Sequence, residues 1–188
     1  SGTMAITIAQ TMNFIDVKAS DFFYEPVKWA VNNKITNGTS STTFSPYKNC
    51  NRAEIVTFLW RAAGSPEPTV TRNPFTDVNS VRDASYYKAI LWASQKGITA
   101  GTNATTFSPY QECTRSQIVT FLYRMQNSPE SKAENPFTDV KADAYYANAV
   151  LWAVENGVTT GASATTFDPA GDCTRGQIVT FLYRCLSK

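Results

Sequence analysis

Apolar residues recur with a helical period in three similar stretches of the chain. In the middle stretch, Ile118, Val119, Phe121 and Leu122 stand at positions i, i+1, i+3 and i+4, which places them on one face of an α-helix. Three blocks share this pattern: residues 50–61, 113–124 and 173–184. Successive blocks are offset by 63 and 60 residues, a period typical of arrays of supersecondary units.

Each block begins with residues that cap a helix. Thr114 is followed three residues later by Gln117, which predicts a capping box in which each side chain bonds a free amide of the helix start. The equivalent pairs are Asn51 with Glu54, and Thr174 with Gln177. We therefore expect a capped second helix in every repeat and a structural role for these side chains.

A second periodic stretch precedes each block. Residues 86–96 carry Tyr86, Ala89, Ile90 and Ala93 on one face, which predicts a first helix. A tryptophan lies beside this face in every copy: Trp29, Trp92 and Trp152. We expect these rings to wedge between repeats, with half-open aromatic platforms as the alternative. The threonine-rich loop that follows begins with a glycine in every copy: Gly38, Gly101 and Gly161.

The repeats predict the domain organisation. Each copy opens with Phe-x-Asp-Val, and polar, proline-containing linkers separate the copies. The expected segments are residues 13–64, 73–127 and 135–188, after residues 1–12, whose Ser1-Gly2-Thr3-Met4 start looks like an expression remnant. Two short helices cannot enclose a core alone. We expect an all-α fold in which three tandem helix-loop-helix repeats pack as one cooperative, pseudo-threefold domain.

The composition limits the possible functions. The 188 residues are 43% hydrophobic and 13% aromatic, enough for a sizeable core. The net charge of +2 is spread without basic runs, which argues against nucleic acid as a partner. No stretch approaches the roughly 18 apolar residues of a membrane span. Residues 5–12 lack the features of a signal peptide, so we expect the leader of a secreted protein to be absent from this chain.

Histidine and cysteine usage narrows the chemistry. The chain has no histidine, which excludes serine-histidine and cysteine-histidine catalysis. Cys50, Cys113 and Cys173 occupy the same repeat position with a spacing that matches no zinc motif. We expect buried free thiols, no metal site and no cofactor. Cys185, in the last helix, either pairs with one of these cysteines or is also free.

An arginine follows the cap in every copy: Arg52, Arg115 and Arg175. A cation at the first helical position opposes the helix dipole, at a cost of roughly 0.3 to 1 kcal/mol when exposed. One explanation is a salt bridge to a nearby carboxylate, for example Asp77 at the opening of a repeat. The other is an anion site, because free amides at a helix start and a guanidinium fork together suit a carboxylate or phosphate.

In this order, the motifs Phe-x-Asp-Val, Trp-Ala, Gly-(Ile/Val)-Thr-x-Gly, Thr-Phe-x-Pro and Thr-Arg-x-(Glu/Gln) resemble the S-layer homology domain over residues 13–188. The resemblance implies a three-pronged pseudo-trimer that anchors bacterial surface proteins noncovalently to a secondary cell-wall polysaccharide, often one with pyruvate ketals. It therefore implies an extracellular location at the cell wall. The implied glycan-binding residues are Arg52, Arg115, Arg175, Trp29, Trp92, Trp152, Gly38, Gly101 and Gly161. The family's Gly-Tyr-x-Asp-Gly-Thr-Phe loop is replaced here by forms such as Gly-Thr-Ser-Ser-Thr-Thr-Phe.

Three functions compete. The first is a non-catalytic anchoring module that binds an acidic glycan through arginines in grooves between repeats. The second is a protein-protein interaction or surface-lattice module that uses the same grooves for other surface proteins. Salt should weaken the first kind of binding and spare the second. The third is a glycosidase with paired carboxylates such as Glu54 and Asp77, which we rank last because no acidic pair recurs across the copies.

Overall fold

The computed structural model describes residues 12–70 and 72–188, and the helices found there number six. Their bounds are α1 Tyr24–Asn32, α2 Arg52–Ala62, α3 Ala84–Gln95, α4 Arg115–Met125, α5 Ala147–Glu155 and α6 Arg175–Leu186. These described residues contain isolated β-bridges and no sheet, so the all-α prediction is confirmed. The proposed N-terminal remnant lies almost entirely outside the described residues.

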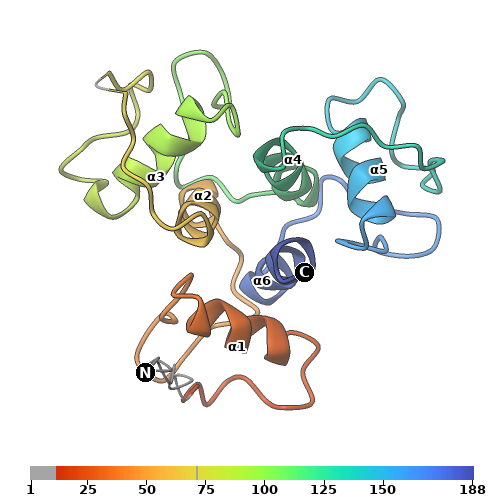
Figure 1. Cartoon of the computed structure of the whole chain (residues 1–188), viewed down its shortest axis with the longest axis horizontal. Coiled ribbons are helices and arrows are strands. Elements are labelled where there is room, and N and C mark those ends of the chain that lie inside the picture. Colours follow the sequence, from red (N-terminus) through yellow and green to blue (C-terminus); the bar gives the residue numbers. More distant parts are fainter. Residues whose placement is uncertain (1–11, 71) are drawn as a thin grey trace, which may run out of the picture.

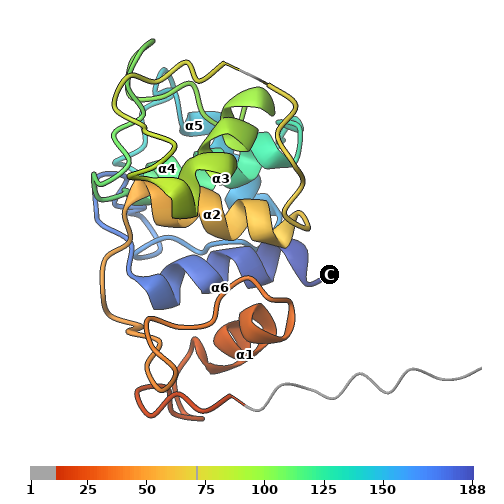
Figure 2. The same ribbon diagram turned by 90° about the vertical axis from the view of Figure 1, so that its left-hand side faces the viewer.

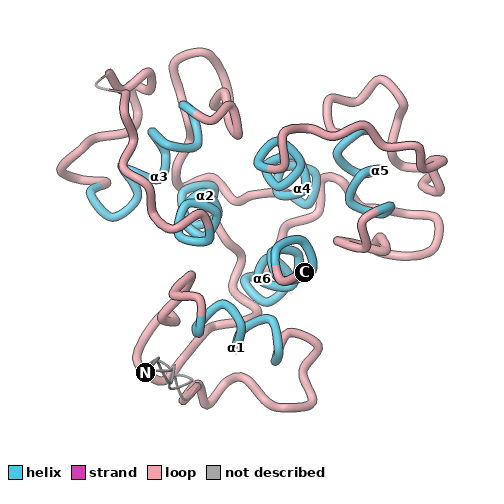
Figure 3. Tube along the Cα trace, viewed as in Figure 1, coloured by secondary structure: helices cyan, strands magenta, loops and turns pink. Residues whose placement is uncertain are grey.

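The helices form a pseudo-threefold arrangement. Viewed end on, α2, α4 and α6 surround the centre, while α1, α3 and α5 lie outside them in three lobes (Figure 1). Figure 2 shows that α2 and α6 lie roughly parallel. Much of each lobe is loop, as the tube drawing makes clear (Figure 3). The expected three-pronged shape is therefore the observed one.

Each lobe is built from two successive repeats. The outer helix α3 packs on α2 of the preceding repeat, and α5 packs on α4 in the same way. The third lobe joins α1, near the start of the chain, to α6 at its end. No repeat buries its own pair of helices against each other to this extent, so the ring of three lobes closes only when all three repeats are present.

The three repeat-position cysteines meet in a ring of backbone hydrogen bonds between the central helices. Cys113 N–H donates to the Cys50 carbonyl at 3.0 Å, Cys50 N–H to the Cys173 carbonyl at 3.1 Å, and Cys173 N–H to the Cys113 carbonyl at 3.3 Å. All three side chains are fully buried. Cys185 is free as well, which confirms the prediction of free thiols and answers the question of its pairing.

The local signals at the helix ends are confirmed. All three second helices begin with a reciprocal capping box, at Asn51, Thr114 and Thr174. The first helix of repeat one is followed by Lys34, which adopts a φ of +58° where the other two repeats have Gly97 and Gly157, both at +67°. Glycine takes this left-handed conformation without steric cost, whereas lysine does not.

Candidate functional site

The arginine that starts each second helix is buried and reaches into the next repeat. The side chains of Arg52, Arg115 and Arg175 are only 3%, 7% and 4% exposed. In each case Nε–H donates at 2.8 Å to the carbonyl of a buried phenylalanine in the threonine-rich loop. The acceptors are Phe107, Phe167 and Phe44, respectively. These arginines therefore join each second helix to the loop of the following repeat, and the third bond closes the ring.

Two phenylalanine rings hold each guanidinium between them. Cζ of Arg52 lies 4.8 Å from the ring centre of Phe107 and 5.4 Å from that of Phe121. The equivalent distances are 5.0 and 5.7 Å for Arg115, and 4.8 and 5.4 Å for Arg175. A planar guanidinium suits this position because it stacks on aromatic faces and keeps its edge free for hydrogen bonds. Burial lowers the pKa of Arg52, but arginine remains charged in proteins.

The amides at the helix starts are already bonded, which corrects one expectation. Arg52 N–H donates to the Gln111 carbonyl at 2.9 Å, and Ala53 N–H to the Pro109 carbonyl at 3.0 Å. The other two repeats make the same pair of bonds, and the cap satisfies the next amide. The expectation that these amides bind an anion is therefore wrong, because backbone carbonyls of the following repeat already accept their hydrogen bonds.

The salt-bridge explanation holds in one repeat, where Arg175 Nη1 lies 3.8 Å from Glu54 Oε1, but it is wrong for Asp77. No ion pair between Arg52 and Asp77 occurs in the described part of the chain. Instead, the two Asp77 carboxylate oxygens accept the backbone N–H groups of Phe107 and Ser108 at 2.9 and 2.7 Å. The aspartates of the other repeat openings bind their loops in the same manner.

Two of the arginines have a fully buried side-chain nitrogen without a hydrogen-bond partner. Nη2 of Arg52 and Nη2 of Arg115 are buried, and each lacks a hydrogen-bond acceptor within the described residues. A buried charged donor without an acceptor is costly, and such groups are rare in native structures. Each of these nitrogens can therefore still donate a hydrogen bond.

Arg52 lines a groove of about 340 Å³ that three repeats build together. Besides Arg52 on α2, its lining includes Gly101 in the loop of repeat two, Gln117 and Thr120 on α4, and Tyr145 just before α5. The structure thus brings together Arg52 and Gly101, two of the predicted site residues. A Cβ atom at Gly101 would collide with the Thr106 carbonyl oxygen, and its φ is +86°, so the backbone alone accounts for this glycine.

The tryptophans lie elsewhere. Trp92 and Trp152 are buried, and each lines a cavity other than the groove at Arg52. Trp29 packs edge-on against Tyr183, and Trp152 contacts Tyr123, in both cases at 5.7 Å between ring centres. These contacts join different repeats, which favours the wedge interpretation over the aromatic platform.

Sequence reasoning missed the other residues of the groove. Gln117 had a sufficient explanation as a capping residue, and its second role follows only from the packing of α4 beside Arg52. Tyr145 stands seven positions before Trp152, where the other repeats have Phe22 and Ser85. Alignment of the three copies on their tryptophans would have drawn attention to this variable position.

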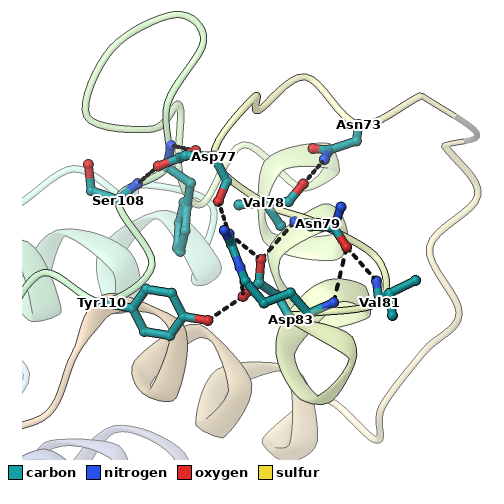
Figure 4. A network of polar contacts seen from close by, with 10 residues as sticks. Asn73, Asp77, Val78, Asn79, Val81, Asp83, Ser108 and Tyr110 are labelled. Carbon is teal, nitrogen blue, oxygen red and sulfur yellow. Dashed lines mark hydrogen bonds and ion pairs between the residues drawn. The ribbon is translucent and has the colours of Figure 1, made fainter.

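A polar network in repeat two holds the loop that supports Arg52 (Figure 4). The buried Asp83 carboxylate accepts Arg82 Nη2–H at 2.8 Å, Asn79 N–H at 2.7 Å and the Tyr110 hydroxyl. Arg82 also donates to the Asp77 carbonyl at 2.6 Å. Hydrogen bonds from Arg82 hold the pKa of Asp83 well below its usual range, against the opposing effect of burial. The network thereby ties the segment before α3 to the segment before α4.

The other chemistry weighed from the sequence finds little support. Glu54 caps α2, and both oxygens of Asp77 are bonded to backbone amides, so neither carboxylate is placed for glycoside hydrolysis. Across residues 12–70 and 72–188, no group of three or more acidic or cysteine side chains is arranged to hold a metal ion. No helix in these segments has the length and apolar character that a membrane crossing requires.

Comparison with known proteins identifies the class. A family model described as the S-layer homology domain matches residues 13–56, 74–119 and 136–179, and proteins with this domain use it as a non-catalytic module for anchoring at the cell surface. The chain belongs to the S-layer homology domain family. The recognition made from the repeated motifs is confirmed.

Individual relatives are longer proteins of several kinds. The surface-layer 125 kDa protein of Lysinibacillus sphaericus is 30% identical over 174 residues, which cover 90% of this chain and 14% of that protein. An endoglucanase of Bacillus sp. (strain KSM-635) is 29% identical over 184 residues, 93% of this chain and 19% of that protein. The S-layer protein of Bacillus thuringiensis subsp. finitimus is 21% identical over 186 residues, 97% of this chain and 22% of that protein. The chain thus spans less than a quarter of these relatives.

Proposed function

We propose that the chain anchors a bacterial surface protein to an acidic cell-wall polysaccharide, whose carboxylates bind at arginines in the grooves between repeats. The observation that carries this proposal is the buried, unpartnered Nη2 of Arg52 and of Arg115. A carboxylate in the groove would supply the missing acceptor through a charge-assisted hydrogen bond. Phosphate is a weaker candidate, since the helix amides that would favour it are already bonded.

The rest of the groove at Arg52 suits a sugar. Tyr145 offers an exposed aromatic face for the apolar side of a pyranose ring, while Gln117 and Thr120 offer donors and acceptors for hydroxyl groups. The resemblance to the family adds the pyruvate ketal as a candidate source of the carboxylate. With a volume of about 340 Å³, the groove is large enough to admit a sugar unit.

The second candidate is a protein-protein or surface-lattice module. Exposed aromatic side chains favour it: Phe22, Tyr47, Tyr110 and Tyr145 are 63%, 73%, 53% and 65% exposed. Apolar contacts of this kind would hold in high salt, whereas binding through a guanidinium and a carboxylate would weaken.

Cosedimentation with purified cell walls tests the proposal. We expect the chain to bind native walls, to release in high salt, and to lose binding when the acid groups of the polymer are removed chemically. Arg52→Ala combined with Arg115→Ala should lower the affinity at least about tenfold, since a hydrogen bond to a charged group contributes about 1.5 to 3 kcal/mol. Arg72→Ala, which removes an exposed linker charge, is the matched control.

The substitutions also remove a buried hydrogen bond, so binding must be measured well below the melting temperature of each variant. Undiminished binding by the folded double variant would refute the arginine contact. Undiminished binding to walls stripped of acid groups would instead favour the protein-protein alternative.

A further inference from the structure

A second hollow adjoins the groove at Arg52. Arg124, near the end of α4, lines both this groove and a neighbouring cavity of about 350 Å³, which Lys96 also lines and which we call the Lys96 cavity. We infer that Arg124 and Lys96 form a second anion subsite, so that the chain binds two acid-bearing units of one polymer in succession, the first at Arg52. The inference rests on the proposed function and adds to it a second subsite and the charge pattern of the ligand.

The two hollows share their walls. One face of α4 lines the groove, with Gln117, Thr120, Phe121 and Arg124 at positions i, i+3, i+4 and i+7. The next residue of this helix, Met125, lines the Lys96 cavity. In the segment after α3, Ile98 lines the cavity and Thr99 lines the groove. The hollows therefore follow one another along α4, and a chain-like ligand that lies in the groove can continue past Arg124 into the cavity.

Cations line both hollows, and carboxylates line neither. Arg52 and Arg124 contribute to the groove, Arg124 and Lys96 contribute to the cavity, and none of the residues that line them is acidic. Across residues 12–70 and 72–188, neither Arg124 nor Lys96 forms an ion pair. Positive charge that no neighbouring carboxylate compensates favours a ligand with more than one anionic group.

Arg124 is fixed in place and keeps donors for a ligand. Its Nη1–H donates to the Ile98 carbonyl at 3.2 Å, and the described residues accept no further hydrogen bond from this side chain. The other repeats make the same bond, from Arg61 to Ile35 and from Arg184 to Val158, so the fold accounts for this part of its role. The remaining N–H groups of the guanidinium can bind a carboxylate that lies between the groove and the cavity.

Lys96 is the residue that the repeated fold does not explain. The residues at the corresponding position, four after the tryptophan, are Asn33 and Asn156. Each of them donates Nδ2–H to the tryptophan carbonyl of its own helix, at 2.8 and 2.9 Å, respectively. Lys96 is exposed, and its side chain has no hydrogen-bond or ion-pair partner within the described residues. A cation at this position is therefore particular to repeat two.

The rest of the Lys96 cavity suits a sugar that carries an acid group. Trp92, Ile98 and Met125 give it apolar surface, and the Asn127 amide offers both a donor and acceptors for hydroxyl groups. A few polar groups at the edge of an apolar hollow are typical of sites that orient a small organic ligand.

Two probes test the inference on the full chain. One is a monosaccharide with a single pyruvate ketal, and the other is an oligosaccharide of the same sugar with two of them. NMR spectra report on each hollow, through the buried Nε–H of Arg52 for the groove and the indole N–H of Trp92 for the cavity. We expect the oligosaccharide to shift both signals with one common midpoint, because a single molecule fills both hollows, and to bind more tightly than the monosaccharide.

Lys96→Asn is the matched variant, because it introduces the residue that both other repeats carry at this position. We expect it to weaken the oligosaccharide about threefold to fivefold, the range for loss of one exposed ion pair, and to leave the affinity of the monosaccharide at Arg52 unchanged. Lys132→Asn removes an exposed lysine that lines neither hollow and should change neither affinity. If Lys96 served only to stabilise the end of α3, its loss would lower the melting temperature and spare both affinities.

The outcomes separate this inference from the proposed function. The second subsite is refuted, while the contact at Arg52 stands, if the oligosaccharide leaves Trp92 unshifted. The same holds if Lys96→Asn retains the full affinity for the oligosaccharide or weakens both probes equally. If neither probe shifts the Arg52 signal, the arginine contact of the proposed function is refuted, and the second subsite falls with it.

Discussion

At the scale of single residues, the arginines have one role that the structure shows, joining repeats, and a second that we propose, ligand binding. Nε of Arg115 holds the loop of the next repeat through the Phe167 carbonyl, while Nη2 remains without an acceptor. Lysine cannot take this position, because a single ammonium offers neither the planar face that two phenylalanines enclose nor two separate edges for hydrogen bonds. Under the proposed function, ligand binding in the groove would therefore be coupled to the stability of the contact between repeats.

The cysteines lead to a prediction at the same scale. Burial raises the pKa of Cys50 and of Cys173 to about 12, raises that of Cys113 further, and raises that of Cys185 to about 11. Because the thiolate is the reactive form, an aromatic disulfide reagent at pH 8 should modify the three central thiols at least about a hundredfold more slowly in the native protein than in urea.

Cys185, which is only partly buried, should react first and serves as an internal reference. Four thiols should titrate after unfolding without reductant. If the three central thiols reacted with the reagent as fast in the native protein as in urea, the ring of central cysteines would have to open readily.

At the scale of elements, aspartate side chains hold the loops in place. Burial opposes the charge of Asp139, but the backbone N–H groups of Phe167 and Asp168 outweigh it and keep its pKa below the ordinary value. The pKa of Asp83 is held lower still by Arg82. The loop of repeat three therefore depends on an ionised carboxylate, and Arg115, which donates to the Phe167 carbonyl in that loop, depends on it in turn.

These shifts predict how stability depends on pH. A carboxyl group whose pKa is depressed in the folded state stabilises fully above its unfolded pKa, about 4, and loses this contribution as the pH falls through the folded value. The free energy of unfolding in urea should therefore fall between about pH 4 and pH 2.

Asp83→Asn should lower stability at pH 7 by about 2 kcal/mol, since it removes charged hydrogen bonds, and should flatten the loss on acidification. Asp143→Asn, at an exposed aspartate before α5, is the matched control. It should change neither the stability at pH 7 nor the loss of stability on acidification. A steep acid transition that survives in Asp83→Asn would assign the pH dependence to other groups.

At the scale of the whole molecule, the repeats are interlocked. The cyclic bonds between Cys50, Cys113 and Cys173, the arginine bonds to the following loop, and the lobes shared by neighbouring repeats all cross repeat boundaries. A unit removed from this ring loses the partners of both its helices. The predicted repeats are therefore units of sequence, while the lobes are units of packing.

A fragment of residues 73–127, the second repeat, should therefore remain unfolded. Its α3 would lack α2 and its α4 would lack α5, so most of the apolar burial that offsets chain entropy would be lost. Circular dichroism and amide dispersion in NMR spectra measure this directly, with the full chain as the folded reference. A fragment that melts cooperatively would contradict the interlocked fold.

Local features of this protein could be predicted from sequence alone. The helices, the capping boxes, the free cysteines and the family follow from interactions three or four residues apart and from their repetition. The arginines could also be chosen as candidate site residues from the sequence, because their unfavourable position at the positive end of the helix dipole is a local feature.

The tertiary structure decided what those arginines touch. Arg52 bonds a carbonyl 55 residues away, and Arg175 one that lies 131 residues away, so the partners exist only once the three lobes have closed. The same closure occupies the helix amides and sets Glu54 of repeat one against Arg175 of repeat three. No local pattern contains this information, because near-identical repeat sequences acquire different neighbours only when each packs against the next.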